Sequence, residues 1–177
     1  MSRPPSSRDW AVLASVFLVS FAVLAFEVSL TRVFSVLFNY HYVFVAVSGA
    51  VCGLGLGGFA WHLLSRGGRQ REVGFAGLGF ALAMPASIAL LFGGSGLVGR
   101  HLWAAIIPLL PFTFAGAFLA EVFRSRASEC GRLYHADLFG ASLAAVLIVP
   151  LISFTGALHL VFLLGAVAAV ATTLDFR

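Results

Sequence analysis

The sequence predicts an all-α integral membrane protein, a bundle of about six transmembrane helices with both termini on the cytoplasmic side. The first observation is composition: the 177 residues are 60% hydrophobic and 10% charged, with a mean hydropathy of +1.02, whereas soluble domains are about 25% charged. The second is the length of the apolar runs, which suits helical spans and not the alternating strands of about 10 residues found in outer-membrane barrels. Six spans take roughly 120 of the 177 residues. Too few residues then remain for an additional soluble catalytic domain of about 100 residues.

Polar or glycine-rich segments divide the chain, a single domain, into these spans in order. The first apolar run follows a basic start, but it is long enough to span and lacks a small-residue cleavage site, so we interpret it as a retained helix. An arginine-rich loop separates the second run from the third. A glycine-rich turn precedes the fourth run, and a polar loop precedes the fifth. The predicted spans cover about residues 10–38, 41–64, 73–92, 101–123, 137–153 and 156–174.

The arginines predict how these spans are oriented. All eleven basic residues are arginines, and nine of them lie on the inner side if the N-terminus is cytoplasmic. Arg100 lies in an outer loop and Arg32 near the outer end of the first span. This bias follows the positive-inside rule and predicts that both termini are inside. Because the arginines are dispersed and form no stripe, we expect the lipid bilayer and not nucleic acid as the partner.

Glycines at four-residue spacing predict close helix packing. Gly49, Gly53 and Gly57 share one face of the second span, and Gly140 lies among small residues in the fifth. Small residues let helix backbones approach one another in lipid. We therefore interpret both sets as packing surfaces.

A polar site is predicted in the outer half of the first span. Glu27 lies about 25 Å along the helix from Trp10, and Arg32 lies about 7.5 Å further. A carboxylate at this depth is costly and must face the bundle or a cavity. Together with Asn39 and His41, these residues predict either a site for an ion, a proton or a small polar ligand, or a structural clamp between helices.

A second polar motif is predicted on the inner side. Tyr134, His135 and Asp137 open the fifth span, where Asp137 is expected to cap the helix N-terminus. Glu121 lies near the inner end of the fourth span, with arginines just after it. It either completes an ion network at the interface or remains solvated. Cys52 and Cys130 have no CxxC spacing, so we expect no metal site.

The five histidines fall at two depths. The outer set is His41, His101 and His159, and the inner set is His62 and His135. Ligation of haem by two histidines needs a pair at matched depth on different helices, and each set offers one. An electron-transfer subunit that binds haem or quinone is therefore one hypothesis. The alternative is that these histidines mark the ends of spans.

Three segments resemble the membrane domain of bacterial spermidine synthase-like proteins. Residues 26–35 (FEVSLTRVFS), followed by Tyr40 and His41, resemble the first-span signature of that family, and the glycine-rich residues 53–58 (GLGLGG) resemble its second span. Residues 131–141 (GRLYHADLFGA) are similar to its G-x-x-Y-x-x-D-L-x-G-A segment. The membrane motifs match at Glu27, Arg32, His41, Tyr134 and Asp137.

The resemblance implies a membrane module without the catalytic part. Family members carry a multi-span domain followed by a cytoplasmic aminopropyltransferase-like domain with a Rossmann-type nucleotide fold. That domain's catalytic residues have no counterpart here. We therefore expect a non-catalytic module of a bacterial cytoplasmic membrane, acting as an anchor or as a subunit of a larger complex with other membrane or cytoplasmic proteins. The alternatives are a transporter of protons, small cations or polyamines centred on Glu27, and the haem- or quinone-binding subunit.

Overall fold

The structure, a computed structural model, is almost entirely helical over the residues it describes, which are 7–37, 41–64, 70–93 and 106–175. This part of the chain forms six α-helices and one short 3₁₀ helix and contains no strand, which confirms the predicted all-α class. In chain order the helices are α1 (Ser7–Leu37), α2 (His41–Leu64), α3 (Gln70–Gly93), α5 (Leu109–Ser125), η1 (Ala127–Glu129), α6 (Cys130–Thr155) and α7 (Ala157–Asp175).

Four helical segments are long and apolar enough to cross a membrane. They are Arg8–Val36, Tyr42–Leu64, Gly74–Gly93 and Ala127–Thr155. A shorter apolar helix covers Ala157–Thr173. These helices indicate a membrane protein, as the composition predicts.

One predicted boundary is wrong. The sequence predicts a loop at 124–136 and a fifth span from residue 137, but α5 continues to Ser125 and α6 begins at Cys130. Residues 130–136 lie outside the apolar stretch but inside α6, since Arg, Leu and Ala are all good helix formers. The predicted start of the fourth span, 101–105, lies outside the described residues.

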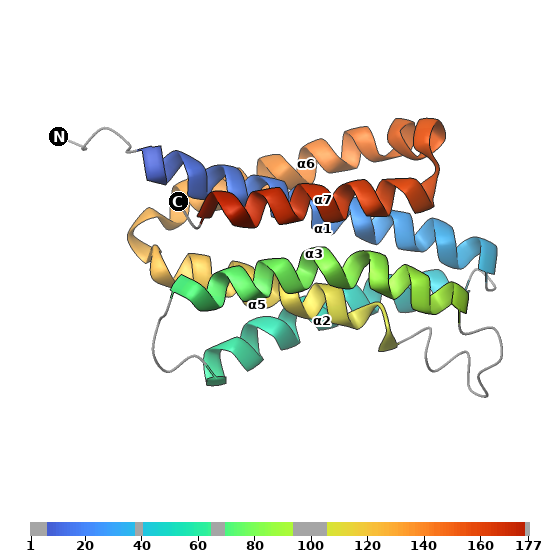
Figure 1. The fold of residues 1–177 in the computed structure, drawn as a ribbon, viewed down its shortest axis with the longest axis horizontal. Coiled ribbons are helices and arrows are strands. Elements are labelled where there is room, and N and C mark those ends of the chain that lie inside the picture. The colour runs from blue at the N-terminus through green and yellow to red at the C-terminus, as the bar shows by residue number, and fades with distance from the viewer. Residues whose placement is uncertain (1–6, 38–40, 65–69, 94–105, 176–177) are drawn as a thin grey trace.

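The helices lie roughly along one axis (Figure 1). α1 packs against α6, α7 and α2, and α5 packs between α2 and α3. α3 also contacts α7, so α1, α2, α5, α3 and α7 form a closed ring, with α6 outside it on α1. The beginning of α1 and the end of α7 lie at the same end of the bundle, which we call the terminal end. The other end, where Gly156 joins α6 to α7, is called the turn end.

The interior of the ring is filled with apolar side chains. The largest fully buried ones are aromatic: Phe26, Phe34, Phe80, Phe112 and Phe118. The rings of Phe26 in α1 and Phe112 in α5 have centroids 5.4 Å apart. Helices in lipid associate mainly through such van der Waals packing, because lipid is as apolar as the side chains.

Glycines allow the closest helix contacts. A Cβ atom placed on Gly57 of α2 would lie 1.9 Å from the backbone oxygen of Thr113 in α5, and one on Gly53 would lie 2.8 Å from the Cβ of Phe112. A Cβ on Gly140 of α6 would lie 2.2 Å from the backbone oxygen of Phe17 in α1. Gly49 is half-buried on α2. Gly53 and Gly57 therefore lie in the contact of α2 with α5, and Gly140 lies in that of α6 with α1.

Candidate functional site

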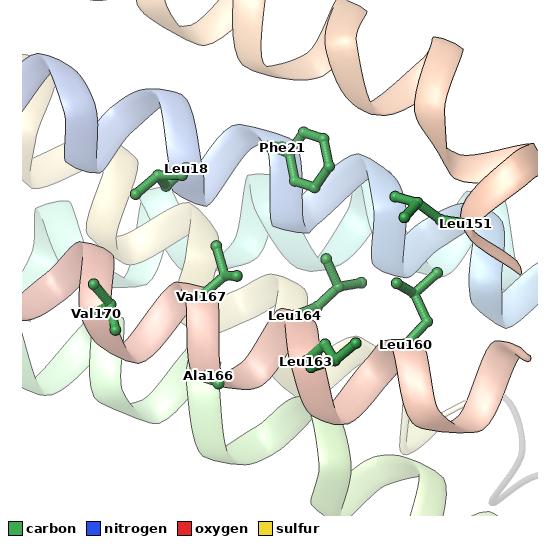
Figure 2. Close-up of a pocket in the computed structure, with 9 residues that line it drawn as sticks. All are labelled: Leu18, Phe21, Leu151, Leu160, Leu163, Leu164, Ala166, Val167 and Val170. Carbon is green, nitrogen blue, oxygen red and sulfur yellow. The ribbon is translucent and has the colours of Figure 1, made fainter. Parts of the chain in front are cut away.

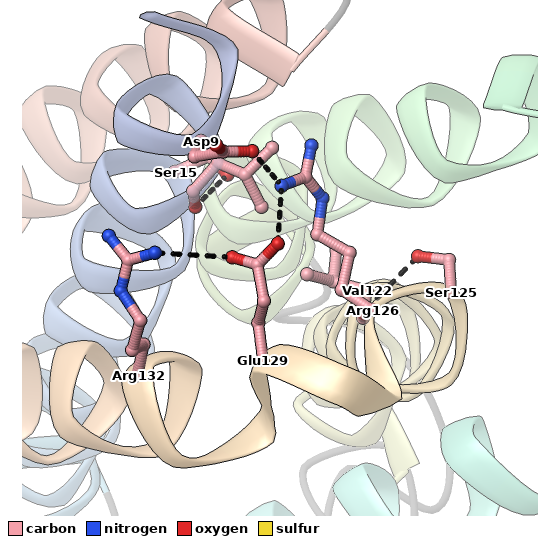
Figure 3. Close-up of polar contacts among 8 residues, drawn as sticks. Asp9, Ser15, Val122, Ser125, Arg126, Glu129 and Arg132 are labelled. Atoms are coloured by element: carbon pink, nitrogen blue, oxygen red, sulfur yellow. Dashed lines mark hydrogen bonds and ion pairs between the residues drawn. The ribbon is translucent and has the colours of Figure 1, made fainter. Parts of the chain in front are cut away.

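A chain of charged side chains joins two distant parts of the sequence at the terminal end (Figure 3). Nη1 of Arg126 lies 2.7 Å from Oδ1 of Asp9 at the beginning of α1, and 3.7 Å from Oε1 of Glu129. Nη1 of Arg132 in α6 lies 3.6 Å from Oε2 of Glu129. Charges of opposite sign thus alternate from α1 across η1 to α6.

The local backbone explains this placement. α5 ends where Arg126 leaves helical geometry (φ −122°, ψ 41°), and its N–H still donates to the carbonyl oxygen of Val122 at 3.1 Å. The 3₁₀ turn that follows places Glu129 three residues after Arg126 and three before Arg132, a spacing at which helical side chains are neighbours. The connection between α5 and α6 is therefore short, ordered and anchored to α1.

Glu121 forms a second contact at this end, between α2 and α5. Its side chain is buried, and it accepts hydrogen bonds from Nε1 of Trp61 at 2.8 Å and from Nε and Nη2 of Arg124, both at 2.9 Å. Buried carboxylates are stable only when they are paired in this way. Of the two predicted interpretations of Glu121, the structure favours the ion network.

Asp137 joins α1 to α6. Its carboxylate accepts a hydrogen bond from the hydroxyl of Ser20. Because α6 begins at Cys130, Asp137 lies about two turns inside the helix. The expectation that Asp137 caps the helix is therefore wrong, and the residue contacts a neighbouring helix instead.

The other two residues of the predicted inner motif lie on the surface. Tyr134 is 54% exposed, and His135 is exposed with its Nδ1 2.6 Å from the carbonyl oxygen of Gly131 in the preceding turn. The structure therefore separates Asp137, which contacts α1, from Tyr134 and His135. These two side chains remain accessible near the terminal end.

Glu27 is half-buried in α1. It follows Ser20 by seven residues, which places it within about 20° of the same helix face on an ideal helix. Within the part of the chain that the structure describes, no hydrogen bond or ion pair joins Glu27 to another residue. The structural clamp therefore has no support among these residues, and transport centred on Glu27 stays a prediction.

The remaining predicted members of that polar site do not gather around Glu27. Arg32 is exposed toward the turn end and lines a cavity there. Asn39 lies outside the described residues. His41 begins α2, but its side chain is outside the description.

The inner histidine pair is not brought together. His62 is exposed near the end of α2 and His135 is exposed on α6, and these two helices do not pack closely against each other (Figure 1). The structure therefore gives no support to a haem held between them. In the outer set, His159 is exposed at the beginning of α7 and His101 lies outside the described residues. Within the described ranges no cluster of three His, Cys, Asp or Glu residues could hold a metal ion.

Four side chains in these contacts are not among the sequence candidates: Asp9, Ser20, Trp61 and Glu129. Asp9 lies just before the first predicted span, although an acidic residue in the first turn of a helix is common. Ser20 and Trp61 lie within apolar runs. A polar atom at such a position is a signal for contact with another helix, but the signal does not name the partner.

The comparisons with known proteins add no relative. No protein family, curated protein or solved structure matches this chain. The functional proposal therefore depends on the contacts above and on the resemblance of the three sequence segments.

Proposed function

We propose that this chain is a non-catalytic, six-span module of a bacterial cytoplasmic membrane, which anchors or assembles a partner protein at its terminal end. One observation carries the proposal. The polar side chains of the terminal end tie α1, α2, α5 and α6 to one another, whereas the ring interior is packed with apolar side chains. A bundle built this way is a rigid support, and its ion pairs lie at the terminal end.

The lengths of the two shorter helices support six spans. α5 has 17 residues and α7 has 19, which correspond to about 26 Å and 28 Å. The hydrocarbon layer is about 30 Å thick. Both helices also pack against the longer α3, so all three can cross the same hydrocarbon layer.

The arginines support a cytoplasmic terminal end. Arg8, Arg124 and Arg132 lie at this end of their helices, and Arg126 lies here between α5 and η1. The positive-inside rule assigns such an end to the cytoplasm. With six spans, both termini are then cytoplasmic.

Exposure of the charged groups supports a partner at this end. The Arg124 side chain is 43% exposed against 4% for Glu121, and that of Arg132 is 45% exposed against 31% for Glu129. These two pairs therefore present their guanidinium groups to the surface more than their carboxylates, and Tyr134 is exposed in the first turns of α6. Arginine and tyrosine are favoured at protein interfaces. This surface suits an acidic face of a cytoplasmic protein, and the resemblance favours a separate aminopropyltransferase-like domain.

Copurification from native membranes in mild detergent tests this proposal. We expect a soluble protein with an aminopropyltransferase-like fold to be retained. The double variant Arg132→Gln, Tyr134→Ala should reduce the retained amount about tenfold, which corresponds to about 1.4 kcal/mol of binding free energy. The control is Ser153→Ala, an exposed position on the same helix near the turn end. A chain that purifies alone, or equal retention by the double variant, contradicts the proposal.

A further inference from the structure

A cavity at the turn end combines apolar walls with two hydrogen-bond donors. It has a volume of about 410 Å³ and lies between α1, the end of α3 and the turn from α6 to α7. Arg32 and His159 are among the residues that line it, and the others are apolar or glycine. The first turn of α7 also lines it. The N-terminal end of a helix carries partial positive charge, so every polar feature of this cavity favours an anion.

The charge of Arg32 is not neutralised within the described chain. No described carboxylate forms an ion pair with Arg32, since the four ion pairs of this part of the protein involve Arg124, Arg126 and Arg132 at the terminal end. An arginine that lines an apolar cavity without a partner is a suitable ligand for a phosphate group.

The position of Arg32 along α1 indicates where its ligand comes from. Arg32 follows Arg8 by 24 residues, about 36 Å along the helix. The hydrocarbon layer is about 30 Å thick. If Arg8 lies at one membrane surface, Arg32 lies among the headgroups at the other. The phosphate groups at that depth belong to phospholipids.

A second cavity lies further along α7, toward the membrane centre. It has a volume of about 510 Å³, and α1, α6 and α7 line it with apolar side chains only (Figure 2). Its lining begins at Leu160, directly after His159, and ends at Val170. These eleven residues of α7 cover about 16 Å, or half of the hydrocarbon thickness. This second cavity, which we call the groove along α7, is apolar and as deep as one leaflet. It lies next to an anion site at headgroup level, so it matches a lipid acyl chain.

We propose that the side of the bundle formed by α1, α6 and α7 binds an anionic phospholipid. The phosphate lies at Arg32 and His159, and one acyl chain lies in the groove along α7. This inference rests on the membrane embedding of the proposed function but not on its partner protein. A free phosphate ion would use the two donors but would leave both apolar surfaces without a ligand.

Native mass spectrometry in mild detergent tests the headgroup site. Phosphatidylglycerol and phosphatidylcholine with identical acyl chains are compared. The wild-type chain should bind phosphatidylglycerol about tenfold more tightly, and Arg32→Gln should remove this preference. Arg8→Gln makes the same charge change at the other end and should keep the preference. Equal binding of both lipids by the wild type, or an unchanged preference in Arg32→Gln, overturns the proposal.

A second arm tests the acyl chain and the source of the phosphate. Ala166 is exposed at the groove, so Ala166→Trp should fill it without disturbing the core. Binding of both lipids should weaken while the preference remains, and unchanged binding would remove the acyl chain from the groove. Excess inorganic phosphate should not displace phosphatidylglycerol; displacement would mean a free-anion site and overturn lipid binding. Partner retention by Arg32→Gln should be normal, so this inference and the partner proposal can fail separately.

Discussion

Replacing Gly57 with alanine should lower the unfolding free energy of the bundle by about 2–3 kcal/mol, the upper part of the range for overpacking. The new Cβ would lie 1.9 Å from the backbone oxygen of Thr113. A backbone atom in the second turn of α5 cannot move aside as a side chain can. α2 and α5 must therefore separate, and the neighbouring contact at Gly53 is loosened as well. Thermal unfolding of the purified chain in detergent measures the effect.

The matched control is Gly55→Ala, two residues earlier in the same helix. A Cβ on Gly55 meets nothing within 4 Å. Both substitutions remove a glycine from a helix, which alone favours alanine by about 1 kcal/mol. Gly55→Ala should therefore be neutral or stabilising. If the two variants unfold alike, α2 and α5 do not pack through the glycine face.

Glu121→Ala should have the second large effect. It removes the acceptor of the Trp61 N–H and the partner of Arg124. Orphaned buried donors cost about 1–3 kcal/mol. Because the Arg124 side chain is 43% exposed and can be rehydrated, we expect a loss of about 2 kcal/mol in the same unfolding experiment. Glu121→Gln keeps an acceptor for Trp61 and should lose less.

Glu129→Ala is the control for this prediction. Glu129 also carries a carboxylate between two arginines, but its side chain is 31% exposed and its ion pairs measure 3.6 and 3.7 Å. Exposed ion pairs contribute about 0–1 kcal/mol. A loss for Glu129→Ala as large as that for Glu121→Ala would show that burial does not decide the strength of these contacts.

The helices themselves were largely predictable from the sequence. α2 covers the predicted 41–64 because its apolar run starts and stops sharply. α6 begins seven residues before the predicted 137–153, because hydropathy reports where the apolar stretch begins and the first two turns of α6 are polar. Gly53 and Gly57 could be assigned to a packing face from spacing alone. Their partner helix could not, since every helix here offers apolar and small side chains to its neighbours.

Some of the polar contacts can also be predicted from the sequence, and others cannot. Glu121 and Arg124 are three residues apart on one helix, so their contact follows from sequence. Ser20 and Asp137 are 117 residues apart, as are Asp9 and Arg126. Such pairs depend on how the helices pack, which no local pattern fixes. The cavity that places Arg32 and His159 together depends on the same packing.

Whether the terminal end faces the cytoplasm is tested most directly by thiol labelling. Cys130 is exposed at that end, and after Cys52→Ser it is the single remaining thiol of the chain. We predict that a membrane-impermeant maleimide leaves Cys130 unlabelled in intact cells and labels it once the membrane is permeabilised. Ser153→Cys, near the turn end of a chain without native cysteines, should be labelled in intact cells. Labelling of Cys130 in intact cells would contradict the proposed orientation.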